Sequence, residues 1–507
     1  MTKIVASFHF CNICITRFKK ALKFLILYSY FTPMEREILT TTRKALRINM
    51  NPDIFGTFAE IGGGQEVSRT FFRAGGASNT IAKSVSAYDK SYSDYFYNNN
   101  KSGRYVSEDR LVKMLKKEYE EIVTLLKDKR PEGTCFFAFA NTVATINYSK
   151  DIEGQGWIGM RFQLHPSSEP NEVVMHVNFL ENESTLQQNT LGIIGVNLVF
   201  ACFHYHERPN LFIQSLLDEL STDRININML RMSGPDMNYV DNRLLGVQLV
   251  KNRMCTATLF DRYGKICQPA DYLYKKNVLA FRGSFRPITY VGFDMLKTSY
   301  SIFKKDADYE KENTIALCEI TLNNLLQEGS FDERDFLDRV DILNGMGQNV
   351  MVSHIREYYK LVKYFSQFKI KNLRIVIGAL TFLKVLEKRY YDDLPGGILE
   401  AFGKLFTKNM KMYVYPALHD RTGELLTSHD VLMQDDLKYL YNYLCANSRI
   451  IDIKNANKKY LHIYSHDVLK MIHESNPDWE NYVPKYISSR IKEKNLFGYK
   501  QEKATHP

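Results

Sequence analysis

The sequence predicts an α/β protein with a mixed α/β N-terminal region and a Rossmann-like C-terminal domain built on a parallel sheet. Three observations support this fold class. The chain has 507 residues, more than one compact core usually holds. Its composition, with 45% hydrophobic and 24% charged residues, is that of a globular protein. From about residue 275, apolar strand-like runs alternate with helix-like segments, which is typical of βαβ units.

The first 33 residues differ from the rest. Their apolar runs, 4–16 and 21–31, are separated by a basic stretch, and neither reaches the roughly 18–20 residues of a membrane span. A signal peptide is an alternative, although no small-residue cleavage site follows the second run. We interpret residues 1–33 as a dispensable extension from a translation start set too early, and expect the working protein to begin near Met34.

Cysteine usage and charge narrow the class of protein. Eight cysteines are scattered, and only Cys11 and Cys14 form a CxxC pair, so a reducing, cytoplasmic location fits best. The net charge of +10 favours an anionic partner, such as a nucleotide or a phosphorylated small molecule. The charge is too diffuse to indicate nucleic-acid binding. We expect no membrane association, and the oligomeric state stays open.

Residues 34–274 are predicted to form the first domain, a mixed α/β unit with a glycine-rich loop. A helix should begin after Ser107, a suitable N-cap with Glu108 and Asp109 in the first turn, and end near Leu125. A short strand, 56–61, should precede Gly62 and a helix from 65 to 73. Further strands are expected at 134–141, 173–179 and 193–206, and a hairpin at 254–273 with its turn at 261–264.

Residues 275–507 are predicted to form the second, Rossmann-like domain. The boundary near 274 carries no Pro- or Ser-rich linker. Strands are expected at 277–281, 314–320, 349–353, 373–377 and 412–415, with helices from 292 and at 332–343, 355–365 and 380–388.

The first candidate site is the turn Gly62-Gly63-Gly64, with Gln65 at the start of the next helix. A glycine turn between a strand and a helix can present backbone N–H groups to a phosphate, helped by the helix dipole. Val67 stands where the GxGxxG pattern has its third glycine. The alternative is a tight strand-to-helix connection that binds no ligand.

The second candidate site is a turn that follows the strand at 277–281. Four cations surround a glycine turn at the end of this strand. This arrangement suits an anion bound at the carboxyl end of a parallel sheet. The candidate ligand-binding residues of this turn are Lys276, Arg282, Gly283, Ser284 and Phe285, followed by Arg286 and Thr289.

This turn resembles the GxFxPxH/T opening of the nucleotidylyltransferase superfamily, which includes nicotinate-nucleotide adenylyltransferases. Gly283, Phe285 and Pro287 match, and Thr289 stands at the first His of the HxGH motif. The Gly and second His of that motif are replaced by Val291 and Gly292. Near the C-terminus, Ile487-Ser488-Ser489 resembles the ISSTxxR motif, with Arg490 and Glu493 in place of its Thr and Arg.

Residues 34–499 also resemble a family of long bacterial proteins of poorly established role, often labelled nicotinate-nucleotide adenylyltransferase. Five stretches carry this resemblance: Phe58–Val67, Ile81–Asp89, Leu191–Leu198, Val240–Leu244 and Gly396–Gly403.

The resemblance implies transfer of an adenylyl group from ATP to a phosphorylated acceptor such as nicotinate mononucleotide. Arg286 and Thr289 would be the catalytic residues, Ser488 would join the residues above in holding ATP, and Mg²⁺ is implied by the chemistry alone. Two alternatives stay open. The protein could be a non-catalytic nucleotide-binding or scaffolding protein, as the missing second His favours. The main site could instead be the loop at Gly62–Gly64.

No metal site is predicted. His204 and His206 would share one face of a strand, but no third ligand is identifiable. Asp332, Asp335, Asp338 and Asp341 recur every third residue, and ion pairs within a helix are the expected explanation.

Overall fold

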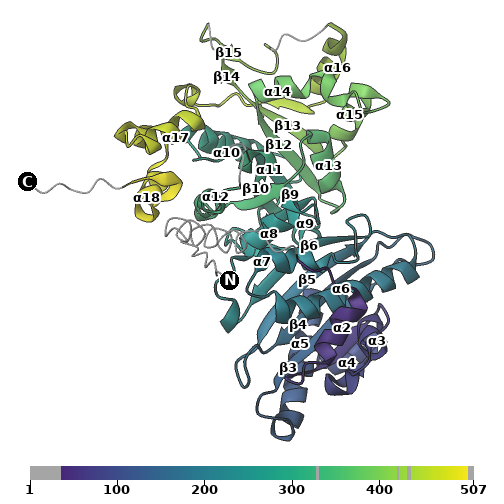
Figure 1. The fold of residues 1–507 in the computed structure, drawn as a ribbon. Helices are drawn as coiled ribbons and strands as arrows, with labels where there is room; N and C mark the ends of the chain where they lie inside the picture. Colours follow the sequence, from purple (N-terminus) through teal and green to yellow (C-terminus); the bar gives the residue numbers. More distant parts are fainter. Residues whose placement is uncertain (1–35, 327–330, 420–421, 431–434, 501–507) are drawn as a thin grey trace, which may run out of the picture. The chain divides into compact units, whose positions relative to one another are not determined.

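The computed structural model describes residues 36–500 except 327–330, 420–421 and 431–434 (Figure 1). The chain divides into a short first unit, Met1–Thr40, and a second unit, Thr41–Pro507, which contains the helices and strands of the described residues. The predicted extension 1–33 lies outside the described residues. The second unit has the α/β fold class that the sequence predicts. Its described residues form two large sheets and a small antiparallel pair, β14 Ala417–Leu418 with β15 Leu425–Leu426.

The first sheet has the strand order β2-β1-β3-β4-β5-β6. Its first three strands are parallel, and the pairs from β3 to β6 are antiparallel, so this half is mixed. The strands are β1 Ile54–Ile61, β2 Ile81–Val85, β3 Cys135–Ala144, β4 Gln155–Phe162, β5 Asn171–Phe179 and β6 Ile225–Ser233.

Helix α5 covers part of this sheet and begins where the sequence predicts. The Ser107 hydroxyl accepts a hydrogen bond from the backbone N–H of Arg110 at 3.2 Å. Leu111, Met114 and Leu115 are fully buried where α5 packs across β1, β3 and β4. The helices of this half are α2 Thr41–Asn49, α3 Glu66–Ala74, α4 Lys90–Tyr97, α5 Glu108–Leu126, α6 Ser184–His204, α7 Pro209–Leu216 and α8 Asn242–Lys251.

The predicted strand at 193–206 is wrong, because this segment lies in helix α6. An apolar run that is buried on all sides has no periodicity by which a helix can be told from a strand. Helix α6 is long and apolar enough to cross a membrane, but 72% of its apolar window is buried within the protein, as in the core helix of a soluble protein.

The second sheet has the order β16-β13-β12-β9-β10-β11-β7-β8. The strands from β16 to β11 are parallel, and the order of β11-β10-β9-β12-β13 is the 3-2-1-4-5 order of a doubly wound fold. The Rossmann-like prediction is therefore confirmed. The strands are β7 Ala257–Phe260, β8 Ile266–Cys267, β9 Asn277–Arg282, β10 Thr314–Thr321, β11 Asn349–Ser353, β12 Asn372–Gly378, β13 Met410–Tyr415 and β16 Ile450–Asp452.

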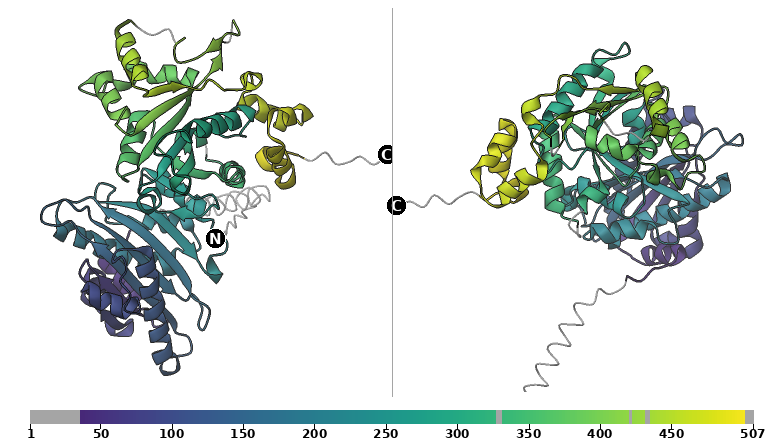
Figure 2. Two further views of the ribbon diagram at one scale, coloured as in Figure 1. Left: turned by 180° about the vertical axis from the view of Figure 1, so that it is seen from behind. Right: turned by 90° about the horizontal axis from the view of Figure 1, so that it is seen from above.

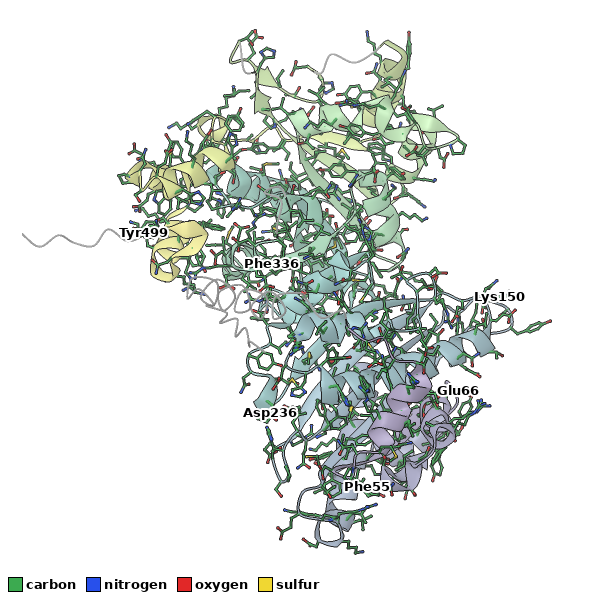
Figure 3. The ribbon with its side chains drawn as sticks, in the orientation of Figure 1. Phe55, Glu66, Lys150, Asp236, Phe336 and Tyr499 are labelled. Atoms are coloured by element: carbon green, nitrogen blue, oxygen red, sulfur yellow. The ribbon has the colours of Figure 1, made fainter. Side chains whose placement is uncertain are left out.

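Apolar side chains fill both faces of this sheet, since Leu279 and Phe281 of β9 lie in one core cluster and Val278 and Ala280 in another. Phe336, labelled in Figure 3, belongs to the first cluster. The helices of this half are α9 Pro269–Leu273, α10 Tyr290–Phe303, α11 Leu322–Leu325, α12 Glu333–Gly345, α13 Tyr358–Ser366, α14 Ala379–Val385, α15 Gly397–Leu405, α16 Asp435–Ala446, α17 Ser465–His473 and α18 Lys485–Lys494.

The C-terminal helices, yellow in Figure 2, are tied to α12 by side chains of the regular acidic series. Lys494 forms an ion pair with Asp341 at 3.2 Å, and Asp338 accepts the backbone N–H of Phe497 at 2.8 Å. The predicted ion pairing within the helix is found for one aspartate of this series, Asp335, which pairs with Arg339.

The hairpin β7–β8 joins the two halves. Its turn is the predicted one, with Gly264 at a φ of 79°. However, β7 pairs antiparallel with β11, so the hairpin belongs to the second sheet although it precedes the predicted boundary at 274. Phe260 and Ile266 share a core cluster with Trp157 of the first sheet, so the two sheets are joined by packed side chains.

Candidate functional site

The three glycines of the Gly62–Gly64 loop are explained by packing within the protein. Gly62 has a φ of 86°, and a Cβ there would lie 1.8 Å from the carbonyl oxygen of Val143. A Cβ on Gly63 would lie 2.5 Å from Leu191. Gly64 has a φ of 80°, a conformation that glycine adopts without strain. The requirement for glycine therefore follows from a tight strand-to-helix connection without any ligand.

The amino end of α3, which begins at Glu66 (Figure 3), is already occupied by a carboxyl group of the chain. The buried carboxylate of Glu60 accepts hydrogen bonds from the backbone N–H groups of Ser68 at 2.9 Å and Val67 at 3.3 Å. The Ser68 hydroxyl and the Asn141 amide also donate to it. Burial raises the pKa of Glu60, while these donors act in the opposite direction.

Gln65, the fourth predicted residue of this loop, donates its side-chain amide to the Ser84 hydroxyl at 3.1 Å. The two backbone N–H groups that donate to Glu60 are therefore not available to a bound phosphate.

The turn at Gly283 is closed on itself. The Phe285 ring covers Gly283, whose Cβ would lie 3.1 Å from it, and packs edge-on against Phe281. The carbonyl oxygen of Gly283 accepts a hydrogen bond from the Asn324 amide at 3.4 Å. The carbonyl oxygen of Ser284 accepts one from Arg339 at 3.1 Å. Gly283, Ser284 and Phe285 lie together as predicted, but in a packed turn.

Arg282 is held by a buried carboxylate. Its guanidinium donates two hydrogen bonds of 2.9 Å to Glu319, which is fully buried in β10. A third, of 2.6 Å, goes to the backbone oxygen of Arg356, and the guanidinium lies 4.6 Å from the ring centre of Tyr358. The charge of Arg282 is therefore balanced inside the fold, and its other N–H groups position the segment that carries Arg356.

Arg286 also has a carboxylate partner, Asp335 of α12, which it shares with Arg339. Thr289 precedes α10, is 3% exposed and makes no capping hydrogen bond with its side chain. The structure brings Arg286 near the turn as predicted, but the two predicted catalytic residues do not line a described cavity.

Lys276 and Ser488 are not brought to the Gly283 turn. Lys276 precedes β9, so it lies at the opposite end of that strand from Arg282, roughly 20 Å away at the rise of an extended strand. Ser488 lies in α18, where its hydroxyl donates to the backbone oxygen of Lys485 at 3.0 Å. Both residues are therefore placed apart from the predicted phosphate site.

A pocket of about 440 Å³ lies beside Arg282, and we call it the carboxyl-end pocket. Arg282 and Thr321 are the last residues of β9 and β10, and His354 directly follows β11. Thr381 and Lys384 lie on α14, which directly follows β12. The helices that follow β9 and β12, α10 and α14, pack in different core clusters on the two faces of the sheet. The pocket therefore lies at the switch point of the sheet, where doubly wound proteins bind their ligands.

Two cations of this pocket are available to a ligand. The side chains of Arg356 and Lys384 are exposed, and neither has an ion pair within the described parts of the chain. His354 is half-buried, and burial lowers its pKa, so it is neutral near pH 7. No motif in the sequence marks these three residues, although His354 directly follows a predicted strand and Lys384 lies in a predicted helix.

Aromatic rings form one wall of the carboxyl-end pocket. Tyr358, Tyr390 and Tyr391 line it, and Tyr390 is the most exposed of the three. Burial raises the pKa of Tyr358 to about 12, so its hydroxyl stays protonated. Rings beside cations suit a ligand with both a flat apolar part and an anionic part.

The described residues contain no cluster of three or more metal-ligating side chains. His204 ends α6 and stacks on Phe200 at 4.0 Å. Within the carboxyl-end pocket the lining carboxylate is Glu357, which pairs with Lys360 at 2.9 Å. A Mg²⁺ ion would therefore take most of its oxygen ligands from bound phosphates and water.

Comparison with known proteins leaves the family undetermined. No protein-family model and no curated protein matches the chain. One solved structure with similarity is competence/damage inducible protein CihA from Agrobacterium tumefaciens, with 14% identity and a TM-score of 0.24. That match covers 33% of this chain and 98% of the other, and at this TM-score it does not establish a common fold.

Proposed function

We propose that the protein binds a nucleotide, or another phosphorylated small molecule, in the carboxyl-end pocket. The observation that carries this proposal is the position of Arg356 and Lys384. They are cations without carboxylate partners among the described residues, and they lie in the crevice at the switch point of a doubly wound sheet. In this proposal they contact the phosphate, and Tyr390 packs against the base or another ring.

Adenylyl transfer from ATP to a phosphorylated acceptor such as nicotinate mononucleotide is the more specific form of this proposal. The family resemblance motivates it, together with the Rossmann-like strand order that carries the Gly283 turn. The roles assigned to Arg282 and Arg286 then pass to Arg356 and Lys384, because the first two are paired with Glu319 and Asp335. The ligand would bring Mg²⁺ on its phosphates.

A nucleotide-binding protein without catalysis is the second candidate. It is favoured by the same paired arginines and by Gly292 at the position of the second His of HxGH. A cytoplasmic location is part of both proposals, and the described cysteines are free thiols.

Calorimetric titration of ATP, with Mg²⁺ present, tests ligand binding. We expect Lys384→Ala and Arg356→Ala each to lower the affinity for ATP about 10- to 150-fold, because each removes one charge-assisted hydrogen bond. The matched control is Lys363→Ala, an exposed lysine of α13 outside the pocket, which should leave the affinity unchanged.

The nucleoside adenosine, which lacks phosphate, should bind the wild type and the Lys384→Ala variant equally. Failure of the wild-type protein to bind ATP, or equal affinities in Lys384→Ala and Lys363→Ala, would overturn the proposal. Formation of pyrophosphate from ATP and nicotinate mononucleotide then separates the enzyme from the non-catalytic alternative.

A further inference from the structure

A second pocket, of about 1090 Å³, lies at the other end of the same strands, and we call it the amino-end pocket. Its floor is formed by the first halves of β9, β10 and β11, including Leu279, Ala316 and Asn349. Helix α10 forms one wall, and Tyr486 of α18 lies across from it beside Gly345. The pocket is separate from the carboxyl-end pocket, and no residue lines both.

The floor of the amino-end pocket is an uncovered part of a parallel sheet. Strand β10 lies between β9 and β11, and parallel strands in such positions are normally covered on both faces. Yet Ala316 of β10, which lies beside Leu279 of β9, is only partly buried. Phe293 of α10, which lines the same space, is 40% exposed. Apolar surface of this kind is available for a ligand with an apolar part.

Lysines surround this apolar floor. Lys276, Lys297 and Lys311 line the pocket, and none has an ion pair with a carboxylate within the described ranges. Lys276 is positioned by hydrogen bonds from its ammonium group to the backbone oxygen of Glu312 at 3.4 Å and to the side chain of Asn313 at 3.2 Å. The three lysines come from three different segments that the fold brings to the lining of one pocket.

The charge around the pocket is positive overall. Four cations, Arg262, Lys276, Lys297 and Lys311, and three carboxylates, Asp261, Asp271 and Glu312, line it. Asp271 forms an ion pair with Arg104, which lies outside the lining. Cations therefore outnumber carboxylates at the rim. A net positive rim around an apolar floor is complementary to a molecule that has an anionic head and an apolar body.

We propose that the amino-end pocket binds an amphipathic anion, a carboxylate, sulfonate or phosphate attached to an alkyl or aromatic body. The head contacts Lys276, Lys297 and Lys311, and the body lies on Ala316 and against Phe293. This site is independent of the proposed nucleotide site, and failure of either proposal leaves the other standing.

Two probes test this site in the full chain. Isothermal titration with decanoate supplies an alkyl anion, and 1-anilinonaphthalene-8-sulfonate supplies an aromatic anion whose fluorescence reports binding. We expect both probes to bind at one shared site, so decanoate should displace the dye. The uncharged alcohol 1-decanol should displace the dye at least about tenfold less effectively.

Charge reversal locates the site. Lys297→Glu should weaken decanoate at least about tenfold, and the control Lys305→Glu, an exposed lysine outside the pocket, should not. Melting temperatures of both variants check the fold. Equal decanoate affinities in the two variants, equal displacement by decanoate and decanol, or no binding by the wild type would overturn the proposal. If only Lys297→Glu has a lowered melting temperature, the variant Ala316→Leu replaces it in the test. The larger side chain should fill the floor of the pocket and weaken the binding of both probes. Unchanged affinity in that variant counts against the site.

Discussion

The charge of Arg282 is balanced inside the fold by Glu319, whose carboxylate also accepts a hydrogen bond from the Ser353 hydroxyl at 2.6 Å. Three strands, β9, β10 and β11, therefore meet at one carboxylate at the edge of the carboxyl-end pocket. A sequence pattern identifies a cation near a turn, but it cannot reveal that a carboxylate 37 residues away in the chain neutralises it. This is why Arg282 and Arg286 look like ligand contacts in the sequence.

The variant Glu319→Gln should lose about 3 kcal/mol of unfolding free energy, because Arg282 would stay buried without a counter-charge. Chemical denaturation measures this change. The control Glu400→Gln removes a solvent-exposed i,i+4 pair with Lys404 on α15 and should cost much less, because water screens this pair. Equal losses in the two variants would contradict the buried-pair interpretation.

If the carboxyl-end pocket binds a nucleotide as proposed, His354 should make the affinity depend on pH. Burial, and secondarily Arg253, lowers the pKa of His354 below its ordinary value, so the ring is neutral at pH 7. A bound anion favours the protonated ring, so protons are taken up on binding and affinity should rise as pH falls from about 8 to about 5. Calorimetry of ATP binding at several pH values, compared with His354→Gln, isolates this contribution from the titration of the phosphate itself. Identical pH profiles would exclude His354.

At the scale of elements, the sequence predicted β9 to β13 of the second sheet because each is a short apolar run between polar turns, but it did not predict the three-residue strand β16. It predicted α5 from its cap at Ser107. It did not predict β2, β4 and β6, although β6 (Ile225–Ser233) begins with a clear apolar–polar alternation, and it mistook part of α6 for a strand. The carboxyl-end pocket could not be predicted from local patterns either, because its residues come from four separate segments of the chain.

Helix α6 packs closely on α3. Substituting one glycine at this contact and one on an open helix surface tests the described packing. A Cβ on Gly195 of α6 would lie 2.3 Å from Val67, so Gly195→Ala should destabilise the protein by about 1–3 kcal/mol. Gly403 of α15 has no atom within 4 Å of an added Cβ, so Gly403→Ala should stabilise it by about 0.5–1 kcal/mol. Thermal and denaturant unfolding of both variants give the two signs, and changes of the same sign would contradict the described packing.

At the scale of the second unit, the predicted boundary at 274 does not separate two cores. Phe260 and Ile266 of the hairpin share a cluster with Trp157 of the first sheet and with Phe336 of α12. A boundary inferred from a change in pattern along the chain marks a change of architecture. It does not reveal that a hairpin before the boundary completes the sheet after it.

A fragment beginning at residue 275 should therefore not fold, because it lacks β7 and leaves the edge of β11 unpaired. A fragment that begins at Asn252 and keeps the hairpin should be more soluble and should show a cooperative melting transition. Circular dichroism and size-exclusion chromatography compare the two fragments. Equal folding of both would show that β7 and β8 are dispensable for the second sheet.

The position of the hairpin also has a consequence for the order of events during synthesis. Strands β7 and β8 leave the ribosome before β9, β10 and β11, yet the strand that pairs with β7 is β11. Although N-terminal segments generally fold first as they are made, the edge of β7 that pairs with β11 must wait until two further βα units have been synthesised. In that interval its exposed edge is the segment of the nascent chain to which a chaperone, or a second copy of the chain, has access.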